Sequence, residues 1–140
     1  GGHGDDMVPL KNYTSVSGVP IAQMIQDSRL DEIIQRTRDG GAEIVKLLKT
    51  GSAFYAPGVS AIEMAESILK NQNKILPCCT LAQGQYGISE QFLGLPVILS
   101  SEGVKKVIEI KLTPEEQKEL VVSASHVKEL CNFIDESGLI

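Results

Sequence analysis

Apolar residues recur at helical spacing in a long stretch near the middle of the chain. One face of this stretch carries Leu30, Ile33, Ile34, Ile44, Val45 and Leu48. Charged residues lie on the opposite face, as in a helix packed on a core. Gly40-Gly41 interrupts the run and costs about 1 kcal/mol per glycine relative to alanine. The pair could break the helix or admit a neighbouring backbone. Because the apolar phase continues beyond it, we predict one long helix, bent there.

A second helix is predicted after the polar break Thr50–Ala53. Its apolar stripe has the i, i+3, i+4, i+7 spacing and consists of Ala61, Met64, Ala65, Ile68 and Leu69. Pro57 suits an early helical position, where its missing N–H is harmless. A capping box formed by Ser60 and Glu63 is the alternative start.

The remaining segments alternate in the manner of strands. Residues 7–21 predict two short strands with a turn at Ser17-Gly18. Later strands are predicted over the ranges 75–81, 92–99 and 107–112. Because the connections are too short for crossover helices, these three should form an antiparallel meander. Pro77 and Pro96 within them indicate edges or bulges.

The final helix has the clearest start signal in the chain. Thr113 is a natural N-cap, Pro114 fits the first helical position and Glu116 fits the third. Its apolar face is predicted to hold Leu120, Val121, Ala124, Val127, Cys131 and Ile134. The order of strands, helices, strands and helix lacks βαβ alternation and predicts a single α+β domain over residues 1–140.

Composition excludes several classes of function. With 42% apolar residues and a net charge of −5, the chain should form a globular core and should not bind nucleic acid. The nearest basic cluster is only Lys105-Lys106. No apolar run is long enough to span a bilayer, so we expect no membrane partner. Three cysteines without CxxC spacing, Cys78, Cys79 and Cys131, are expected to be reduced core residues.

Only two histidines are present, which makes metal catalysis improbable. His126 is interpreted as an exposed residue of the last helix. His3 differs because glycine flanks it on both sides, which lets backbone pass close to a ligand. An imidazole exchanges protons near neutral pH. On the residues alone, His3 is either a proton-transfer group or part of a terminus without function.

Several motifs in order along the chain resemble the lactate/malate dehydrogenase family, particularly bacterial malate dehydrogenases of the lactate-dehydrogenase-like branch. The matching segments are Gly2-His3-Gly4-Asp5 with Met7–Leu10, Gly41–Val45, Thr50–Pro57, Gly84–Gly87, Gly94–Leu99 and Glu109–Thr113. The resemblance covers nearly the whole chain. It implies the C-terminal, substrate-binding domain of a dehydrogenase about twice as long.

The resemblance also assigns roles to individual residues. His3 matches the proton acceptor for the 2-hydroxyl of malate, while hydride passes to the nicotinamide of NAD. Gly51, Ser52 and Ala53 match a loop that borders the substrate, although a plain turn serine is an equal alternative for Ser52. Pro57 matches a position near the cofactor ring. We interpret Asp5 as a structural residue that orients the turn around His3.

Parts of the family's active site have no counterpart in this sequence. The orienting aspartate, the two substrate-binding arginines and the N-terminal nucleotide-binding domain all lie upstream in the family. The chain begins within Gly1–Met7 without an initiator methionine, which we interpret as a cut in a longer protein. We therefore expect the isolated chain to be inactive, with NAD bound mainly by the absent domain.

The resemblance implies that the full-length protein is a cytoplasmic NAD-dependent malate dehydrogenase of the tricarboxylic acid cycle. It should interconvert malate and oxaloacetate as a homo-oligomer, either a dimer or a tetramer. Two alternatives remain open: a lactate dehydrogenase, since the residues that separate the substrates lie largely upstream, and a non-catalytic folded or assembling domain.

Overall fold

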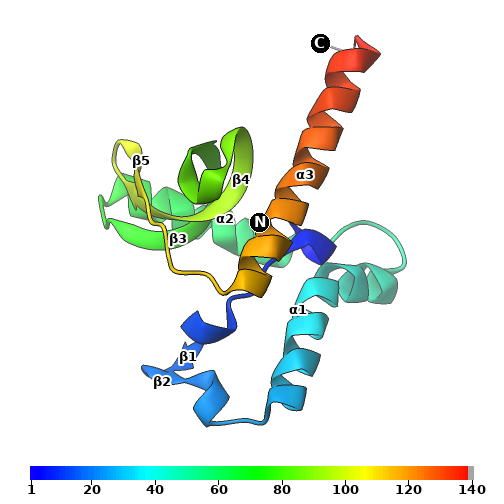
Figure 1. The fold of residues 1–140 in the computed structure, drawn as a ribbon, viewed down its shortest axis with the longest axis vertical. Helices are drawn as coiled ribbons and strands as arrows, with labels where there is room; N and C mark the ends of the chain where they lie inside the picture. The colour runs from blue at the N-terminus through cyan, green and yellow to red at the C-terminus, as the bar shows by residue number, and fades with distance from the viewer. Residues whose placement is uncertain (139–140) are drawn as a thin grey trace.

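A computed structural model describes residues 1–138 of the chain. Three helices and a three-stranded sheet make up most of it, which confirms the predicted α+β class (Figure 1). The helices are α1 (Asp27–Leu48), α2 (Tyr55–Leu69) and α3 (Pro114–Ser137), and the sheet strands are β3 (Lys74–Gln83), β4 (Ser89–Ser100) and β5 (Gly103–Val107). A small hairpin of β1 (Ser15–Val16) and β2 (Val19–Pro20), with single-turn 3-10 helices η1 (Gly4–Asp6), η2 (Lys11–Tyr13), η3 (Ile21–Gln23) and η4 (Gln85–Gly87), completes the fold.

The sheet is the predicted antiparallel meander, with strand order β3-β4-β5. The third strand is shifted from its predicted range: it ends at Val107, where we had predicted it to begin. Residues 108–112 are extended but do not continue the ladder. Ile108 donates its N–H to the Pro96 carbonyl at 2.8 Å, and Ile110 donates to the Tyr86 hydroxyl at 2.9 Å. The alternation in this segment therefore reflects packing of an extended connection and not strand pairing.

The two strand prolines lie directly opposite each other in the β3–β4 register. Pro77 is on β3, an edge strand, as predicted. Pro96 is on the central strand, one residue beyond the last pair between β4 and β5, Val97 with Val107. The prediction for Pro96 was therefore wrong. Pro96 lies neither on an edge strand nor at a bulge, but at a point of β4 beyond which β5 no longer pairs with it.

Both α2 and α3 pack on one face of the sheet. The buried residues of β4, which alternate along the strand, are Leu93, Leu95, Val97 and Leu99. At one end of this face Met64 and Ile68 of α2 pack against the buried cluster, and at the other end Leu120 and Ala124 of α3 do so. Cys78 is buried in this core, whereas Cys79 and Cys131 are exposed, so the prediction of three core cysteines was wrong for two of them.

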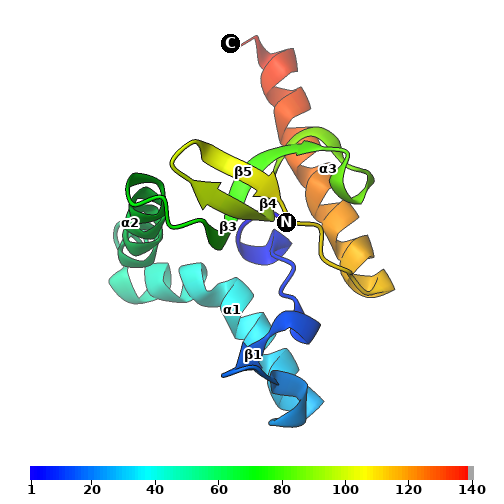
Figure 2. The same cartoon turned by 90° about the vertical axis from the view of Figure 1, so that its left-hand side faces the viewer.

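Helix α1 runs unbroken through Gly40-Gly41, as predicted, and both views show it bending past its middle (Figures 1 and 2). Its apolar face is mostly uncovered: Leu30 is buried, but Ile44 and Val45 are 41% and 40% exposed. The helical period was read correctly, but the elements within residues 1–138 cover this face only near Leu30, and its C-terminal part stays exposed. The alternative of a close backbone approach at the glycine pair is not observed within the described residues, since no atom outside the helix's own backbone lies within 4 Å of a Cβ built at either glycine.

Helix α2 begins at Tyr55, so Pro57 lies in its first turn as predicted, and the alternative start at a Ser60–Glu63 capping box is excluded. Phe54 is the N-cap residue and Pro57 is the third helical residue, so Ser60 lies inside the helix. Within residues 1–138, no helix combines the length and apolar character that a membrane crossing requires.

The predicted capping box of α3 is present. Thr113 Oγ1 accepts the Glu116 N–H at 3.1 Å, and the Glu116 carboxylate accepts the Thr113 N–H at 2.8 Å. Figure 1 shows that the later half of α3 projects away from the rest of the chain. There Cys131 is exposed and Ile134 is 38% exposed, so the predicted apolar face is covered only near the sheet.

Substituting Thr113→Ala will lower the free energy of unfolding by about 0.5–2 kcal/mol, because the Glu116 N–H loses its acceptor. Thr113→Ser keeps the hydroxyl and should remain close to wild type. Urea unfolding of the three proteins measures the difference. Equal midpoints for Thr113→Ala and wild type would show that the cap contributes nothing.

Candidate functional site

His3 lies at the start of a tight turn near the N-terminus. It is the N-cap residue of η1, with φ −106° and ψ 151°, and its side chain is exposed. The following Gly4 has φ +66°, a left-handed conformation that glycine adopts without strain. Within residues 1–138 the His3 imidazole makes no hydrogen bond, not even one that caps η1. The turn therefore presents a proton-transferring side chain to its surroundings with both ring nitrogens available.

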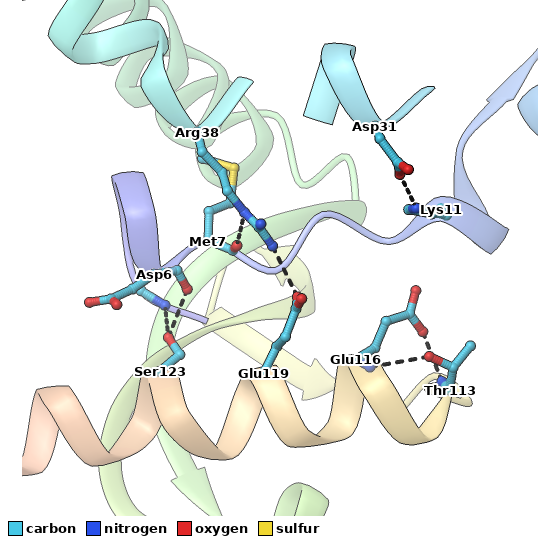
Figure 3. Close-up of polar contacts among 10 residues, drawn as sticks. Asp6, Met7, Lys11, Asp31, Arg38, Thr113, Glu116, Glu119 and Ser123 are labelled. Carbon is cyan, nitrogen blue, oxygen red and sulfur yellow. Dashed lines mark hydrogen bonds and ion pairs between the residues drawn. The ribbon is translucent and has the colours of Figure 1, made fainter. Parts of the chain in front are cut away.

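The segment Gly2–Met7, hereafter the His3 turn, is fastened to α3 by one serine. Ser123 Oγ accepts the Gly2 N–H at 2.6 Å and donates to the Asp6 carbonyl at 2.9 Å. Figure 3 shows Ser123 pointing from α3 toward Asp6. Met7 N–H closes the turn internally on the Gly4 carbonyl at 2.9 Å. The backbone around His3 is thus fixed by a helix from the far end of the sequence.

An arginine of α1 holds the end of the same turn. Arg38 Nε donates to the Met7 carbonyl at 3.0 Å, and its Nη2 lies 3.0 Å from the Glu119 carboxylate of α3 (Figure 3). Arg38 is only 22% exposed, so this ion pair is partly shielded from water. One guanidinium thus joins α1, the His3 turn and α3.

His126 is an exposed residue of α3, as predicted, and its Nδ1 also lies 2.7 Å from Asp6 Oδ1. The interpretation of Asp5 needs correction. Asp5 makes no hydrogen bond within residues 1–138, whereas Asp6 contacts α3 through both its carbonyl and its carboxylate. The aspartate that fixes the turn is Asp6, because the 3-10 turn directs residue 6 and not residue 5 toward α3.

The chain just before the His3 turn pairs with the central strand. Gly1 N donates to the Gly94 carbonyl at 2.7 Å, and Gly94 N donates to the Gly1 carbonyl at 2.9 Å. A Cβ at Gly94 would lie 2.6 Å from the Gly1 carbonyl oxygen. Only glycine fits at this position, and the close approach anchors the upstream side of the turn.

The other predicted site residues lie together in the connection between α1 and α2. Gly51 has φ +87°, Ser52 is exposed and Ala53 is partly buried. Pro57 is exposed in the first turn of α2. No hydrogen bond links this connection to the His3 turn within the described residues, and the turn contacts α1 ten residues before that helix ends. The structure thus brings 51–53 and Pro57 together but leaves them separate from His3.

Sequence reasoning missed Ser123, Arg38 and Asp6 as parts of this site. For Ser123 a signal existed: it lies among the apolar residues Leu120, Ala124 and Val127 of α3 at helical spacing, and it is 2% exposed. A serine on an apolar stripe requires a hydrogen-bond partner. No local pattern indicates that this partner lies 121 residues away. Among residues 1–138, no group of three or more His, Cys, Asp or Glu could hold a metal ion.

Comparison with known proteins identifies the family to which this α+β domain belongs. Residues 1–136 match the family model described as lactate/malate dehydrogenase, alpha/beta C-terminal domain. The chain therefore belongs to the lactate/malate dehydrogenase family, as its C-terminal domain.

Individual relatives agree with this assignment. The malate dehydrogenase of Pelodictyon phaeoclathratiforme is 52% identical over 131 residues, which cover 94% of this chain and 42% of that protein. The malate dehydrogenase structure from Salinibacter ruber has a TM-score of 0.92 and 48% identity, covering 98% of this chain and 46% of the other. A Cryptosporidium parvum lactate dehydrogenase, complexed with lactic acid and nicotinamide adenine dinucleotide, has a TM-score of 0.92 and 38% identity, covering 96% and 44%. The chain spans less than half the length of these relatives.

Proposed function

We propose that this chain is the substrate-binding and catalytic C-terminal part of an NAD-dependent malate dehydrogenase that interconverts malate and oxaloacetate. The observation that carries the proposal is the His3 turn, an exposed imidazole on a backbone held from both α1 and α3. Roughly 50% identity to proteins named malate dehydrogenase supports the choice of substrate.

In this proposal His3 is the proton acceptor. As malate is oxidised, the proton of its 2-hydroxyl moves to an imidazole nitrogen and the hydrogen on C2 leaves as hydride; in the reverse reaction His3 returns the proton. NAD, when bound, supplies the hydride acceptor. A neutral imidazole suits the task because its ordinary pKa lies near working pH. The short bonds of Ser123 and Arg38 to the turn keep the imidazole in place relative to the substrate.

Gly51, Ser52 and Ala53 are proposed to border the substrate, and Pro57 to lie beside the cofactor ring. The open space over Gly51, where a Cβ would meet no atom within 4 Å, fits the approach of a flat ring or a small acid to the backbone. In this proposal these residues contact only the nicotinamide end of the dinucleotide. Binding of the remainder is assigned to an N-terminal nucleotide-binding domain outside this sequence.

The full-length protein is further proposed to be a cytoplasmic homo-oligomer, a dimer or a tetramer. Support comes from the apolar face of α1, where Ile33, Ile44, Val45 and Leu48 are 40–47% exposed. Apolar surface of this kind marks a face that another protein surface covers. The neighbouring domain and a second subunit are both suitable occupants.

Turnover of oxaloacetate and pyruvate by the full-length protein tests the substrate. We expect kcat/KM for oxaloacetate to exceed that for pyruvate. A preference for pyruvate would instead support lactate dehydrogenase, the second candidate, which the likeness to the Cryptosporidium parvum enzyme favours.

The 140-residue chain alone is predicted to oxidise malate with NAD no faster than a protein-free control. The reason is that no carboxylate bonds to the His3 imidazole within the described residues, and the chain spans less than half the length of its malate dehydrogenase relatives. Absorbance of NADH measures the rate, with the full-length protein as the positive control. A rate above background would contradict the prediction. If the full-length protein is inactive as well, the remaining alternative is a non-catalytic assembly domain, which light scattering would detect as an oligomer.

A further inference from the structure

We propose that Ser123 of α3 is a positioning residue that sets the orientation of His3. This inference rests on the proposed role of His3 as the proton acceptor. Ser123 does not itself face the reacting atoms; it acts through the backbone of the His3 turn.

The hydroxyl of Ser123 joins the two sides of the turn at a single atom. It accepts from Gly2 N–H, one residue before His3, and donates to the Asp6 carbonyl, three residues after it. A hydroxyl can do both at once, whereas an amide or carboxylate oxygen can only accept. The side chain is 2% exposed, so water does not compete for either bond.

The His3 turn needs such a link because its two glycines make its backbone flexible. Gly2 and Gly4 flank His3, and glycine loses more conformational freedom on ordering than any other residue. Rotation about either glycine would swing the imidazole while leaving the rest of the domain intact. Bonds at Gly2 and Asp6 restrict both glycines together.

The other contacts of the turn do not replace this link. Arg38 and His126 hold Met7 and Asp6, which are both downstream of His3. On the upstream side Ser123 is the only hydrogen-bond partner of Gly2 within the described residues, and the next anchor is the pairing of Gly1 with Gly94. Loss of the hydroxyl should therefore loosen His3 while α3 stays docked through Leu120 and Ala124.

The test uses the full-length protein with Ser123→Ala and the matched control Ser125→Ala. Ser125 is an exposed serine of the same helix, and its hydroxyl bonds within residues 1–138 only to the Val122 carbonyl of its own turn. We expect Ser123→Ala to lower kcat by about 10- to 100-fold, since small displacements of a catalytic group cost that much. KM for oxaloacetate should stay within about twofold of wild type, as expected when the transition state and not ground-state binding is affected. Ser125→Ala should match wild type in both constants.

A double-mutant cycle with His3→Gln separates positioning from general stability. If Ser123 acts through His3, then Ser123→Ala will cause no further loss of kcat in the His3→Gln background. An equal fall in both backgrounds would overturn the proposal and make Ser123 merely structural. If His3→Gln loses activity but Ser123→Ala does not, only the role of Ser123 is wrong. If His3→Gln keeps wild-type kcat, the proposed function itself fails and this inference falls with it.

Should Ser123→Ala fail to fold, Ser123→Cys provides the same test. The thiol has a similar shape but is a weaker donor and acceptor than the hydroxyl. The proposal requires Ser123→Cys to lower kcat with KM unchanged, and wild-type kcat in this variant overturns it.

Discussion

Substituting His3→Gln in the full-length protein will lower kcat/KM for oxaloacetate by about 10²- to 10⁴-fold, the usual contribution of general acid–base catalysis. Glutamine has a polar side chain of similar length but cannot take up and return a proton near neutral pH. Because His3 is exposed and makes no hydrogen bond within residues 1–138, its loss should leave the thermal midpoint unchanged. Steady-state kinetics and a thermal unfolding scan on the same preparation measure both quantities.

Lys128→Gln is a suitable control for this experiment, since Lys128 is an exposed residue of α3. It should leave both the kinetics and the thermal midpoint at wild-type values. Wild-type kcat/KM in His3→Gln would exclude His3 as the proton acceptor. A lowered thermal midpoint in His3→Gln would instead assign the residue a structural role.

Substituting Gly94→Ala will destabilise the 140-residue chain by about 1–3 kcal/mol, the usual cost of forcing an extra carbon into a packed position. The new Cβ would lie 2.6 Å from the Gly1 carbonyl oxygen, so the N-terminal segment must move away from β4. That movement breaks the two bonds between Gly1 and Gly94 and shifts the upstream anchor of His3. Urea unfolding measures the stability, and the same variant in the full-length protein should also lose activity.

Gly41→Ala is the matched control, because the same substitution at that position should raise the free energy of unfolding and not lower it. Gly41 lies inside α1, and a Cβ at this position would meet no atom within 4 Å. Alanine in a helix interior is favoured over glycine by about 0.5–1 kcal/mol, so this variant should be more stable than wild type. Equal effects of the two substitutions would mean that the contact at Gly94 does not constrain the fold.

Elements with local signals were predicted well from the sequence. The cap of α3 was read from Thr113, Pro114 and Glu116 because all three act within one helical turn. The hairpin turn at Ser17-Gly18 was likewise local, with φ of 50° and 86°. The third strand was misplaced because residues 108–112 alternate like a strand but bond to Pro96 and to a side chain of Tyr86. Alternation reports which side chains are buried, not what the backbone bonds to.

The residues of the candidate site also differ in whether the local sequence could identify them. His3 and Gly51 could be singled out from neighbouring residues and from family resemblance, and their roles remain predictions. The residues that hold the His3 turn, Ser123 and Arg38, come from distant parts of the chain. Their spacing along the sequence carries no information about their meeting, because folding of the intervening sheet and helices brings them together.

The bond from Gly2 to Ser123 joins residues 121 positions apart and has a consequence for biosynthesis. A ribosome makes His3 at the beginning of this domain but cannot complete the turn around it until α3 has been translated and released. Contacts of such long sequence separation form late, after the chain between them is ordered. A nascent chain halted before residue 123 would therefore carry His3 without the hydrogen bonds that hold the turn around it.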